Sequence, residues 1–433
     1  MSEYSTIIER LFGLNELNVK LGLENISGLL KHLGNPQKEL KTIHIAGTNG
    51  KGSTALFLNS IFNISGYKTG LYVSPHLIDI RERITVGTRK ISQKSFIELS
   101  EHIFCVMEKE DLPVTFFEFV TALAFLHFSQ ERVDIGIIEV GLGGRLDATN
   151  VLNPLVSVIT EIGLEHTQYL GSSIKEVAAE KGGIIKPGGA VFISAENKEA
   201  VTVLNNKAII KKTTCFQYGK DFTVSHINED SQHDNDKIPL PQTFSIEFQG
   251  RKLIKLKINT AGNFQIKNSS TATAVALYLS KKYRAINENS ICEGLKKTTI
   301  PCRMELIQKS PRIVLDAAHN FHAIQVLIEN ISLFFTYKRL IVILGILNDK
   351  DYKKIIKVLS TRADTFIMTE PVSKRALSAR LLENEASSLN KQTFIEKKVS
   401  KALKKAKEVA GSHDLILVTG SFYSVGEALS ELS

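Results

Sequence analysis

Short apolar segments alternate with longer amphipathic segments between residues 40 and 195 of the chain. The apolar segments have the length of buried strands, and they lie at 42–46, 70–73, 133–140, 155–160 and 190–194. Segments of helix length, with apolar residues three or four positions apart, lie at 53–65, 94–108 and 117–130. Strands that alternate with helices in this way predict a parallel sheet covered by helices on both faces.

The pattern changes after this region. Residues 221–242 are polar and contain prolines, which indicates a loop or an edge hairpin. Residues 243–248 and 253–258 alternate between apolar and polar side chains around a Gln-Gly pair, which predicts a β-hairpin. A helix over about 265–282 is expected to close this half of the chain.

Alternating strand and helix patterns start again after Lys297. The expected strands are 312–315, 340–344, 365–368 and 415–418, and the expected helices are 322–333, 352–359, 376–389, 399–410 and 425–432. This part of the chain, roughly 135 residues long, has the size of a separate doubly wound domain. We therefore expect two domains, 1–297 and 298–433.

The composition is that of a globular protein and narrows the function classes. Of the 433 residues, 43% are hydrophobic and 23% are charged, which is ordinary for a soluble protein. No apolar run approaches the ~20 residues that span a membrane, and the first residues lack the features of an export signal. The four cysteines form no CxxC pair, which favours reduced thiols over a zinc site. We therefore expect a cytoplasmic protein without a membrane partner.

The formal net charge of +9 is best explained by a lysine-rich surface. A basic protein could bind nucleic acid, but no arginine-rich tail, zinc finger or stacking-aromatic motif accompanies the charge. We therefore expect no nucleic-acid partner, and a positive field that favours the approach of anionic small molecules.

The strongest chemical signal follows the first apolar segment, in the run Gly47-Thr48-Asn49-Gly50-Lys51-Gly52-Ser53. Glycines let backbone N–H groups turn toward an anion, the helix N-terminus adds positive charge, and a lysine can reach terminal phosphates. The run departs from the ordinary P-loop, because its first two glycines are too close together and a glycine separates Lys51 from Ser53. It therefore predicts phosphate binding more strongly than ordinary NTPase activity. A glycine-rich turn without function is the alternative, but it would leave Lys51 without a purpose.

Polar residues also follow or end three of the predicted strands. Ser74 follows 70–73, Glu139 lies near the end of 133–140, and His166 follows 155–160. Strand ends are where α/β sheets place ligands, and oxygen donors with one histidine suit Mg²⁺ or Mn²⁺ better than zinc. Taken singly, each has a simpler explanation: a turn cap, a buried paired carboxylate and a surface histidine. Their shared position favours a metal site.

These motifs resemble, in type and order, those of the folylpolyglutamate synthases and dihydrofolate synthases, ATP-dependent amide ligases related to the Mur ligases. The matching segments run through nearly the whole chain: 21–24, 33–36, 47–53, 74–77, 81–83, 139–150, 180–184, 303–305, 316–320, 345–351 and 419–422. The resemblance implies an α/β fold. It consists of an N-terminal P-loop-type parallel-sheet ATPase domain with a small extra β-hairpin sheet, which binds ATP and folate, and a C-terminal Rossmann-like glutamate-ligase domain.

The resemblance also implies a role for each matching position. ATP would be held by Asn49, Gly50, Lys51, Gly52, Ser53, Asn268, Arg303, Asp316, His319 and Ser421. The pteroate group would be held by Arg83, Thr115, Phe116, Phe117, Glu118, Leu146, Asp147 and Ala148. One Mg²⁺ would be bound by Ser74 and Glu139, and a second by His166, near a carbamylated Lys181. Catalytic roles would fall on Lys51, His166 and Lys181, and a monovalent cation would accompany the two Mg²⁺ ions.

By local pattern alone, Lys181 is only a lysine that ends a helix before a glycine. The chain departs from the family in two places: Glu165 stands where aspartate is common, and Gly182 where alanine is common. Neither change removes an implied ligand.

The reaction implied is carboxylate activation: ATP phosphorylates a carboxylate, and the amine of L-glutamate attacks the acyl phosphate. The substrates would be dihydropteroate and the γ-carboxylate of (tetrahydro)folate, so the protein would be a bifunctional dihydrofolate synthase and folylpolyglutamate synthase. Positioning and charge neutralisation supply most of the rate in such transfers, and ATP between two domains predicts their closure.

Two other activities remain alternatives. A Mur-type ligase would act on a nucleotide-linked cell-wall precursor, but Mur loops place threonine directly after the lysine. A P-loop ATPase switch would need no amino-acid acceptor. The family precedent favours a monomer.

Overall fold

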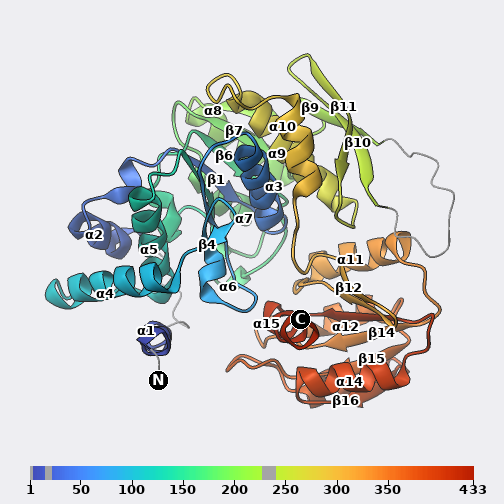
Figure 1. The fold of residues 1–433 in the computed structure, drawn as a ribbon. Helices are drawn as coiled ribbons and strands as arrows, with labels where there is room; N and C mark the ends of the chain where they lie inside the picture. Colours follow the sequence, from blue (N-terminus) through green and yellow to red (C-terminus); the bar gives the residue numbers. More distant parts are fainter. Residues whose placement is uncertain (1–2, 15–21, 227–239) are drawn as a thin grey trace.

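The computed structural model describes residues 3–14, 22–226 and 240–433. Residue 21 of the first family segment and residues 227–239 of the predicted polar loop lie outside these ranges. The described chain forms two α/β units that lie one above the other in Figure 1. Each unit is built on a central β-sheet. The fold class predicted from the sequence is therefore confirmed. Among the described helices, none has both the length and the apolar content needed to cross a membrane.

The N-terminal unit is built on an eight-stranded sheet in the order β4-β3-β2-β5-β1-β6-β7-β8. All neighbours from β2 to β8 pair in parallel, and β3 and β4 extend one edge in the antiparallel sense. The strands are β1 (Thr42–Ala46), β2 (Thr69–Tyr72), β3 (Ile84–Val86), β4 (Arg89–Lys90), β5 (Ile135–Glu139), β6 (Val156–Ile159), β7 (Ala190–Ile193) and β8 (Thr214–Gln217). Every strand predicted in this unit is present, and the predicted parallel sheet is confirmed.

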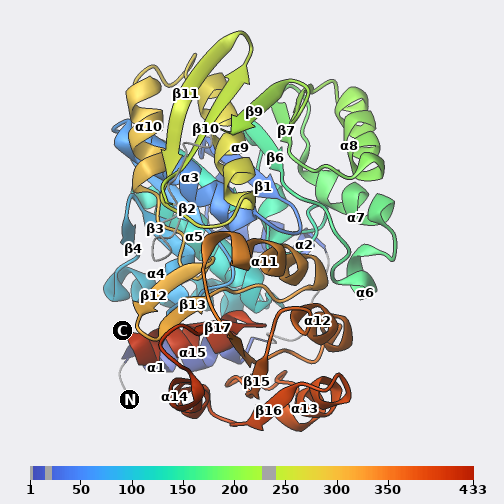
Figure 2. The ribbon, with the colours of Figure 1, turned by 90° about the vertical axis from the view of Figure 1, so that its right-hand side faces the viewer.

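Helices cover both faces of this sheet, as the two views in Figures 1 and 2 show. One face packs on α3 (Lys51–Ile64), α9 (Phe264–Leu279) and α10 (Glu288–Lys297). The other faces α1 (Glu3–Phe12), α2 (Glu24–His32), α4 (Gln93–Lys109), α5 (Phe116–Gln130), α6 (Thr167–Leu170), α7 (Ile174–Lys181) and α8 (Lys198–Ile210). Successive side chains of a strand point to opposite faces, so Ile43 and Ile45 enter the first core and Ala46 enters the second.

A small antiparallel sheet in the order β11-β10-β9 lies beside α9 and α10. It consists of β9 (Phe222–His226), β10 (Gln242–Phe248) and β11 (Arg251–Ile258). The predicted hairpin is β10–β11, and its turn residues Gln249 and Gly250 both have positive φ, at 50° and 73°. Such turns match the twist of paired strands.

The C-terminal unit has a six-stranded sheet in the order β12-β13-β17-β14-β15-β16, in which only β12 is antiparallel. Its strands are β12 (Glu305–Lys309), β13 (Arg312–Leu315), β14 (Leu340–Leu344), β15 (Thr365–Met368), β16 (Gln392–Ile395) and β17 (Leu415–Thr419). Its helices are α11 (Phe321–Phe334), α12 (Tyr352–Leu359), α13 (Ala379–Ser388), α14 (Val399–Val409) and α15 (Phe422–Leu432). Separate cores on the two faces confirm the doubly wound arrangement.

Four single-turn 3₁₀ helices connect these elements: η1 (Pro36–Lys38), η2 (Ile80–Arg83), η3 (Ala148–Val151) and η4 (Gly182–Ile184). Three of them fall inside family segments that the sequence singled out, namely the segments around Arg83, Ala148 and Gly182. These segments are therefore ordered turns that hold side chains in place.

Candidate active site

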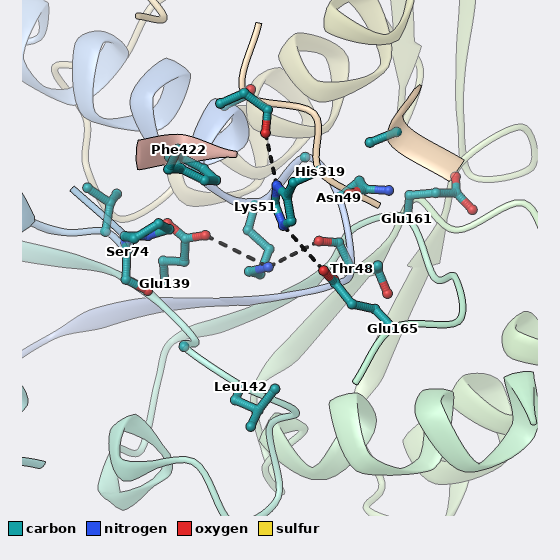
Figure 3. Close-up of a pocket in the computed structure, with 18 of the residues that line it drawn as sticks. Thr48, Asn49, Lys51, Ser74, Glu139, Leu142, Glu161, Glu165, His319 and Phe422 are labelled. Carbon is teal, nitrogen blue, oxygen red and sulfur yellow. Dashed lines mark hydrogen bonds and ion pairs between the residues drawn. The ribbon is translucent and has the colours of Figure 1, made fainter. Parts of the chain in front are cut away.

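A cavity of about 2000 Å³ opens between the two units. Figure 3 shows its centre, where the phosphate loop, the ends of first-sheet strands and loops of the C-terminal unit meet. The predicted nucleotide and metal residues that line it are Asn49, Gly50, Lys51, Gly52, Ser53, Ser74, Glu139, His166, Lys181, Asn268, Arg303, Asp316 and His319. The predicted pteroate residues that line it are Arg83, Thr115, Phe116, Phe117, Glu118, Leu146, Asp147 and Ala148.

The phosphate loop joins the end of β1 to the start of α3. Gly47 and Gly50 have φ values of 151° and 88°, which favour glycine. A Cβ on Gly47 would lie 1.8 Å from Oγ1 of Thr160, so this position also excludes a side chain. The helix begins at Lys51 instead of the predicted Ser53, and its first turn borders the cavity. The loop therefore presents backbone donors and the positive end of a helix to an anion.

Lys51 and Glu139 place opposite charges at this loop. The Lys51 Nζ lies 3.9 Å from Oε1 of Glu139 and donates to the carbonyl oxygens of Gly47, at 3.0 Å, and Thr48, at 3.2 Å. Oε2 of Glu139 accepts from the backbone N of Ser74 at 3.1 Å. Burial raises the pKa of Glu139, and the charge of Lys51 opposes that rise. A buried carboxylate whose ion pair with Lys51 is as long as 3.9 Å, and which has one backbone donor, is costly unless a further cation approaches.

The donor set at this place fits a hard divalent cation. Carboxylate and hydroxyl oxygens from Glu139 and Ser74 lie beside the phosphate loop, and a Cβ on Gly52 would come 3.4 Å from Oε2 of Glu139. In the described part of the chain, no group of three or more His, Cys, Asp or Glu side chains is arranged to hold a metal ion by itself. Phosphate oxygens or water would therefore have to complete the coordination.

Lys181 is buried, which its sequence pattern did not predict. It lies at the end of α7, is 4% exposed, and its Nζ donates to the carbonyl oxygen of Gly47 at 2.8 Å. Gly144 packs directly on it, because a Cβ there would come 2.8 Å from the Lys181 carbonyl oxygen. Burial, assisted by the charge of Lys51, lowers the pKa of Lys181 to about 7. A lysine in this state is uncharged often enough near neutral pH to act as a nucleophile.

His166 directly precedes α6 and has a φ of 50°, and it lines the cavity. Burial, together with the charge of Lys350, lowers the pKa of His166 to about 4. Its ring is therefore neutral at physiological pH, which is the form that binds metals.

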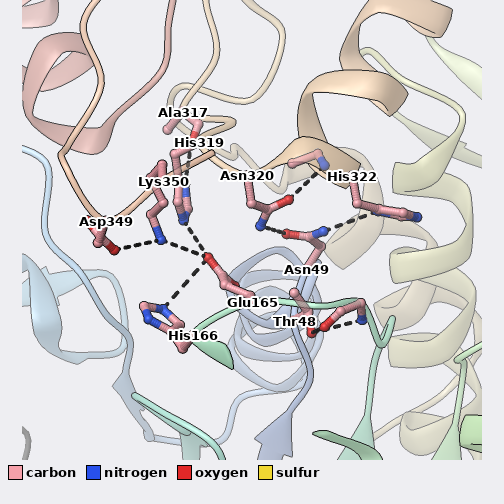
Figure 4. A network of polar contacts seen from close by, with 12 residues as sticks. Thr48, Asn49, Glu165, His166, Ala317, His319, Asn320, His322, Asp349 and Lys350 are labelled. Atoms are coloured by element: carbon pink, nitrogen blue, oxygen red, sulfur yellow. Dashed lines mark hydrogen bonds and ion pairs between the residues drawn. The ribbon is translucent and has the colours of Figure 1, made fainter. Parts of the chain in front are cut away.

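Loops of the C-terminal unit reach the phosphate loop directly (Figure 4). The side-chain oxygen of Asn49 accepts from Nδ2 of Asn320 at 3.0 Å, and Nδ2 of Asn49 lies 3.3 Å from Nδ1 of His322. The other side-chain atom of Asn320, Oδ1, caps α11 by accepting from the N of Ala323. One residue of the phosphate loop is thus tied to the first turn of a helix in the other unit.

Of the residues of the C-terminal unit that were predicted to contact ATP, some face the cavity and others bind their own backbone. The Arg303 guanidinium lies 4.9 Å from the ring centre of Phe422, and both residues line the cavity. Asp316 is buried and accepts from the N of Met304 and of Ala318, each at 2.8 Å, so it shapes its own loop. Ser421 does not line the cavity; its hydroxyl caps α15 by accepting from the N of Ser424 at 3.0 Å.

Two carboxylates in the predicted pteroate pocket also accept hydrogen bonds from neighbouring residues of the same loop or helix. Glu118 accepts from the backbone N and the hydroxyl of Thr115, at 2.9 and 2.8 Å, and so closes the first turn of α5. Asp147 accepts from the N of Leu142 at 2.8 Å and from the N of Thr149 at 3.0 Å. The surfaces left for a ligand are therefore mainly the apolar side chains, among which Phe116 has the Arg83 guanidinium 5.3 Å from its ring centre.

Sequence reasoning missed several residues at this site. Glu165 was noted only as a departure from the family, and Lys350 only as part of a matching segment, yet they form an ion pair across the two units. His76 accepts from Nε of Arg83 at 2.9 Å and so fixes that side chain. All three lie in loops that follow predicted strands, namely 70–73 for His76, 155–160 for Glu165 and 340–344 for Lys350, and this shared position was the usable signal.

Models of two protein families match the chain. The Mur ligase middle domain matches residues 45–276, and the Mur ligase, glutamate ligase domain matches residues 302–422. The chain is 33% identical over 428 residues to the dihydrofolate synthase/folylpolyglutamate synthase of Bacillus subtilis, which covers 98% of this chain and 97% of that protein.

Solved structures agree with this match over the whole length. FolC of E. coli in complex with DHPP and ADP superposes with a TM-score of 0.87 at 28% identity, covering 99% of this chain and 97% of that one. A bifunctional folylpolyglutamate synthase/dihydrofolate synthase with Mn, AMPPNP and L-glutamate bound gives a TM-score of 0.85 at 28% identity, with 98% of each chain covered.

Proposed function

The chain belongs to the dihydrofolate synthase/folylpolyglutamate synthase family of Mur ligases, and we propose that it activates its substrate carboxylate in the cavity beside Lys51 and Glu139. It is an ATP-dependent ligase that joins L-glutamate to folates, and it uses a divalent metal ion. The close approach of Lys51 to Glu139 at the start of α3, under loops of the second unit, carries the proposal.

The phosphates of ATP lie on the backbone donors of the loop from Asn49 to Ser53, with Lys51 against the terminal phosphate. Asn268, Arg303, Asp316 and His319 complete the nucleotide site from the two units. Ser421 supports α15 beside that site instead of touching ATP. The substrate lies against Phe116, Phe117 and the loop 146–148, with its carboxylate near Arg83.

The reaction has two steps. The terminal phosphoryl group of ATP passes to the substrate carboxylate, which gives an acyl phosphate and ADP. The amine nitrogen of L-glutamate then attacks the carbonyl carbon, the amide bond forms, inorganic phosphate leaves and the amine loses a proton. The chain contributes charge and position through Lys51, Arg303 and Arg83, and no side chain needs to act as a nucleophile.

Two divalent cation sites accompany this arrangement. Glu139 and Ser74 hold one ion, and His166 and a carbamate on Lys181 hold the other, with a monovalent cation nearby. Such ions, when bound, neutralise the charge that moves between the phosphate oxygens. The lowered pKa of Lys181 supports the modification, since only the neutral amine reacts with CO₂. The intact mass of active enzyme is expected to include one carbamate, and fully active enzyme with an unmodified Lys181 would contradict its role.

The two units divide the work. Residues 1–297 bind ATP and the folate, and residues 298–433 complete the site for glutamate. The protein acts as a monomer in the cytoplasm on small molecules, without a nucleic-acid or membrane partner. Both dihydropteroate and reduced folates are acceptors, because one cavity adjoins the pteroate pocket and the phosphate loop.

ADP release tests the function. We expect release to require both L-glutamate and either dihydropteroate or tetrahydrofolate, and each omission to lower it to the background rate. Turnover with tetrahydrofolate alone would restrict the protein to chain elongation. ATP hydrolysis that is indifferent to folate and glutamate would instead indicate an ATPase and contradict the ligase.

A further inference from the structure

Glu165 lies where the two units meet (Figure 4). It belongs to the loop after β6, and its side chain is only 9% exposed. Its Oε1 lies 3.2 Å from Nζ of Lys350 and 3.3 Å from Nε2 of His319, both in the C-terminal unit. The same oxygen lies 3.7 Å from Nε2 of the adjacent His166. Glu165 therefore places one carboxylate oxygen within ion-pair distance of two basic side chains of the other unit.

The two partners come from either side of one strand. His319 follows β13 and Lys350 follows β14, and these strands flank β17 in the sheet. The carboxylate of Glu165 therefore spans the carboxyl end of β17. In open α/β sheets, ligands bind in the crevice at such ends, where neighbouring connections leave in different directions.

Both partners are also held from within their own unit. Nδ1 of His319 lies 2.9 Å from the carbonyl oxygen of Ala317, which fixes the orientation of the ring. Lys350 also pairs with Oδ2 of Asp349 at 3.3 Å, and Asp349 pairs with Arg375 at 2.6 Å. The C-terminal unit thus presents two prearranged basic side chains, and Glu165 of the other unit contacts both.

We propose that Glu165 is a positioning residue that holds the two units together over the phosphate loop by binding His319 and Lys350. Its length matters, because one oxygen makes both contacts and an aspartate, which is one methylene shorter, would hold that oxygen farther from both partners. This inference rests on the proposed function, since it assigns the closed arrangement to the step in which glutamate meets the acyl phosphate.

Variants at Glu165 test the inference. Glu165→Gln keeps the size and removes the charge, and Glu165→Asp keeps the charge and shortens the reach. We expect each to lower kcat/KM for L-glutamate by at least about tenfold, because the first removes the charge from a buried ion pair and the second moves the charge away from its partners. We expect X-ray scattering with a non-hydrolysable ATP analogue at saturating concentration to give a larger radius of gyration than for the natural protein.

Asp349→Asn is the matched control, because it neutralises a carboxylate on the same lysine without crossing the boundary. It is expected to leave the radius of gyration unchanged. Lys350→Gln removes the partner of Glu165 that lies in the other unit. The double variant Glu165→Gln/Lys350→Gln is expected to lose no more activity than the worse single variant. Additive losses, or Glu165 variants with natural kcat/KM and radius, would overturn the inference. Natural protein that releases ADP without glutamate would overturn the proposed function instead, and the scattering result would still stand by itself.

Discussion

His44 shows how strongly burial acts on one side chain. It lies in the middle of β1, is fully buried, and its Nε2 lies 2.8 Å from Oγ1 of Thr149. Its Nδ1 has no hydrogen-bond partner within the described residues. Burial, with the nearby charge of Lys186, lowers the pKa of His44 to about 3. Between pH 6.5 and about 3 the ring is therefore largely neutral in the folded protein, although an unfolded chain would protonate it.

Acid should therefore destabilise the protein through this residue. Between pH 6.5 and about 3 the unfolded chain binds a proton at His44 that the folded chain does not, so the free energy of unfolding falls as pH falls through this window. One such group contributes up to about 1.4 kcal/mol per pH unit. In urea unfolding from pH 7 to 4, His44→Gln is expected to show a shallower dependence on pH than the natural protein. An unchanged slope would show that His44 is not the group responsible.

Single residues were predictable from the sequence where a backbone pattern placed them. Lys51 and Glu139 stand at strand and loop positions that the apolar pattern already marked, and the structure puts them in one cavity. The burial of Lys181 could not be predicted, because it depends on Gly144 and the loop around it, which approach from another part of the chain. The pairing of Glu165 depends in the same way on how two units come together.

At the scale of elements, strands with a regular apolar pattern were predictable, and short or polar strands were not. The strand predicted over 42–46 is β1 with the same bounds, because all five of its residues are buried and only His44 interrupts its apolar or small side chains. β8, β12 and β16 were missed, since their side chains are largely half-buried or exposed and leave no continuous apolar run. Packing against a neighbouring strand, which the sequence does not display, decides such elements.

The phosphate loop makes a prediction about backbone conformation. Gly50 has a φ of 88°, and a Cβ there would lie 2.5 Å from Oδ1 of Asn268. Gly50→Ala is expected to lower the free energy of unfolding by about 1–3 kcal/mol and to raise KM for ATP at least about tenfold, because Asn268 must move. Steady-state kinetics and urea unfolding measure the two effects.

Gly66 provides the matched control for this change. It follows α3 with a φ of 86°, yet a Cβ there meets no atom within 4 Å. Gly66→Ala should therefore cost a similar amount of stability and leave KM for ATP unchanged. If both variants raised KM equally, strain in the backbone and not the contact with Asn268 would be the cause.

At the scale of the whole molecule, the two units meet at more places than the ion pair of Glu165. The backbone N of Asn263, at the start of α9, donates to Oδ1 of Asn330 in α11 at 2.8 Å. On the other side of the cavity, Gly426 of α15 lies against the carbonyl oxygen of Leu77, only 2.1 Å from where a Cβ would stand. The two units are thus joined by a hydrogen bond at α9 and by a contact at Gly426 that leaves no room for a Cβ.

Gly426→Ala should therefore separate the units without disturbing either core. We expect kcat to fall by at least about fivefold, a larger radius of gyration in X-ray scattering, and less than about 1 kcal/mol of lost stability in the C-terminal unit. Gly411→Ala is the control in the same unit, because its Cβ would meet the nearest atom at an ordinary 3.4 Å. Equal losses in the two variants would contradict a role for the contact with Leu77.

The division of the cavity between two units has a kinetic consequence. The apolar wall at Phe116 and Phe117 belongs wholly to the first unit, whereas His319 and Lys350 belong to the second and are joined to the first through Glu165. If that joint must open to admit each glutamate, every turnover needs one separation of the units. The lengthened product would then be held during each separation by the first unit alone. On that basis we expect the length of the finished chain to depend on a competition between dissociation from that wall and the next closure.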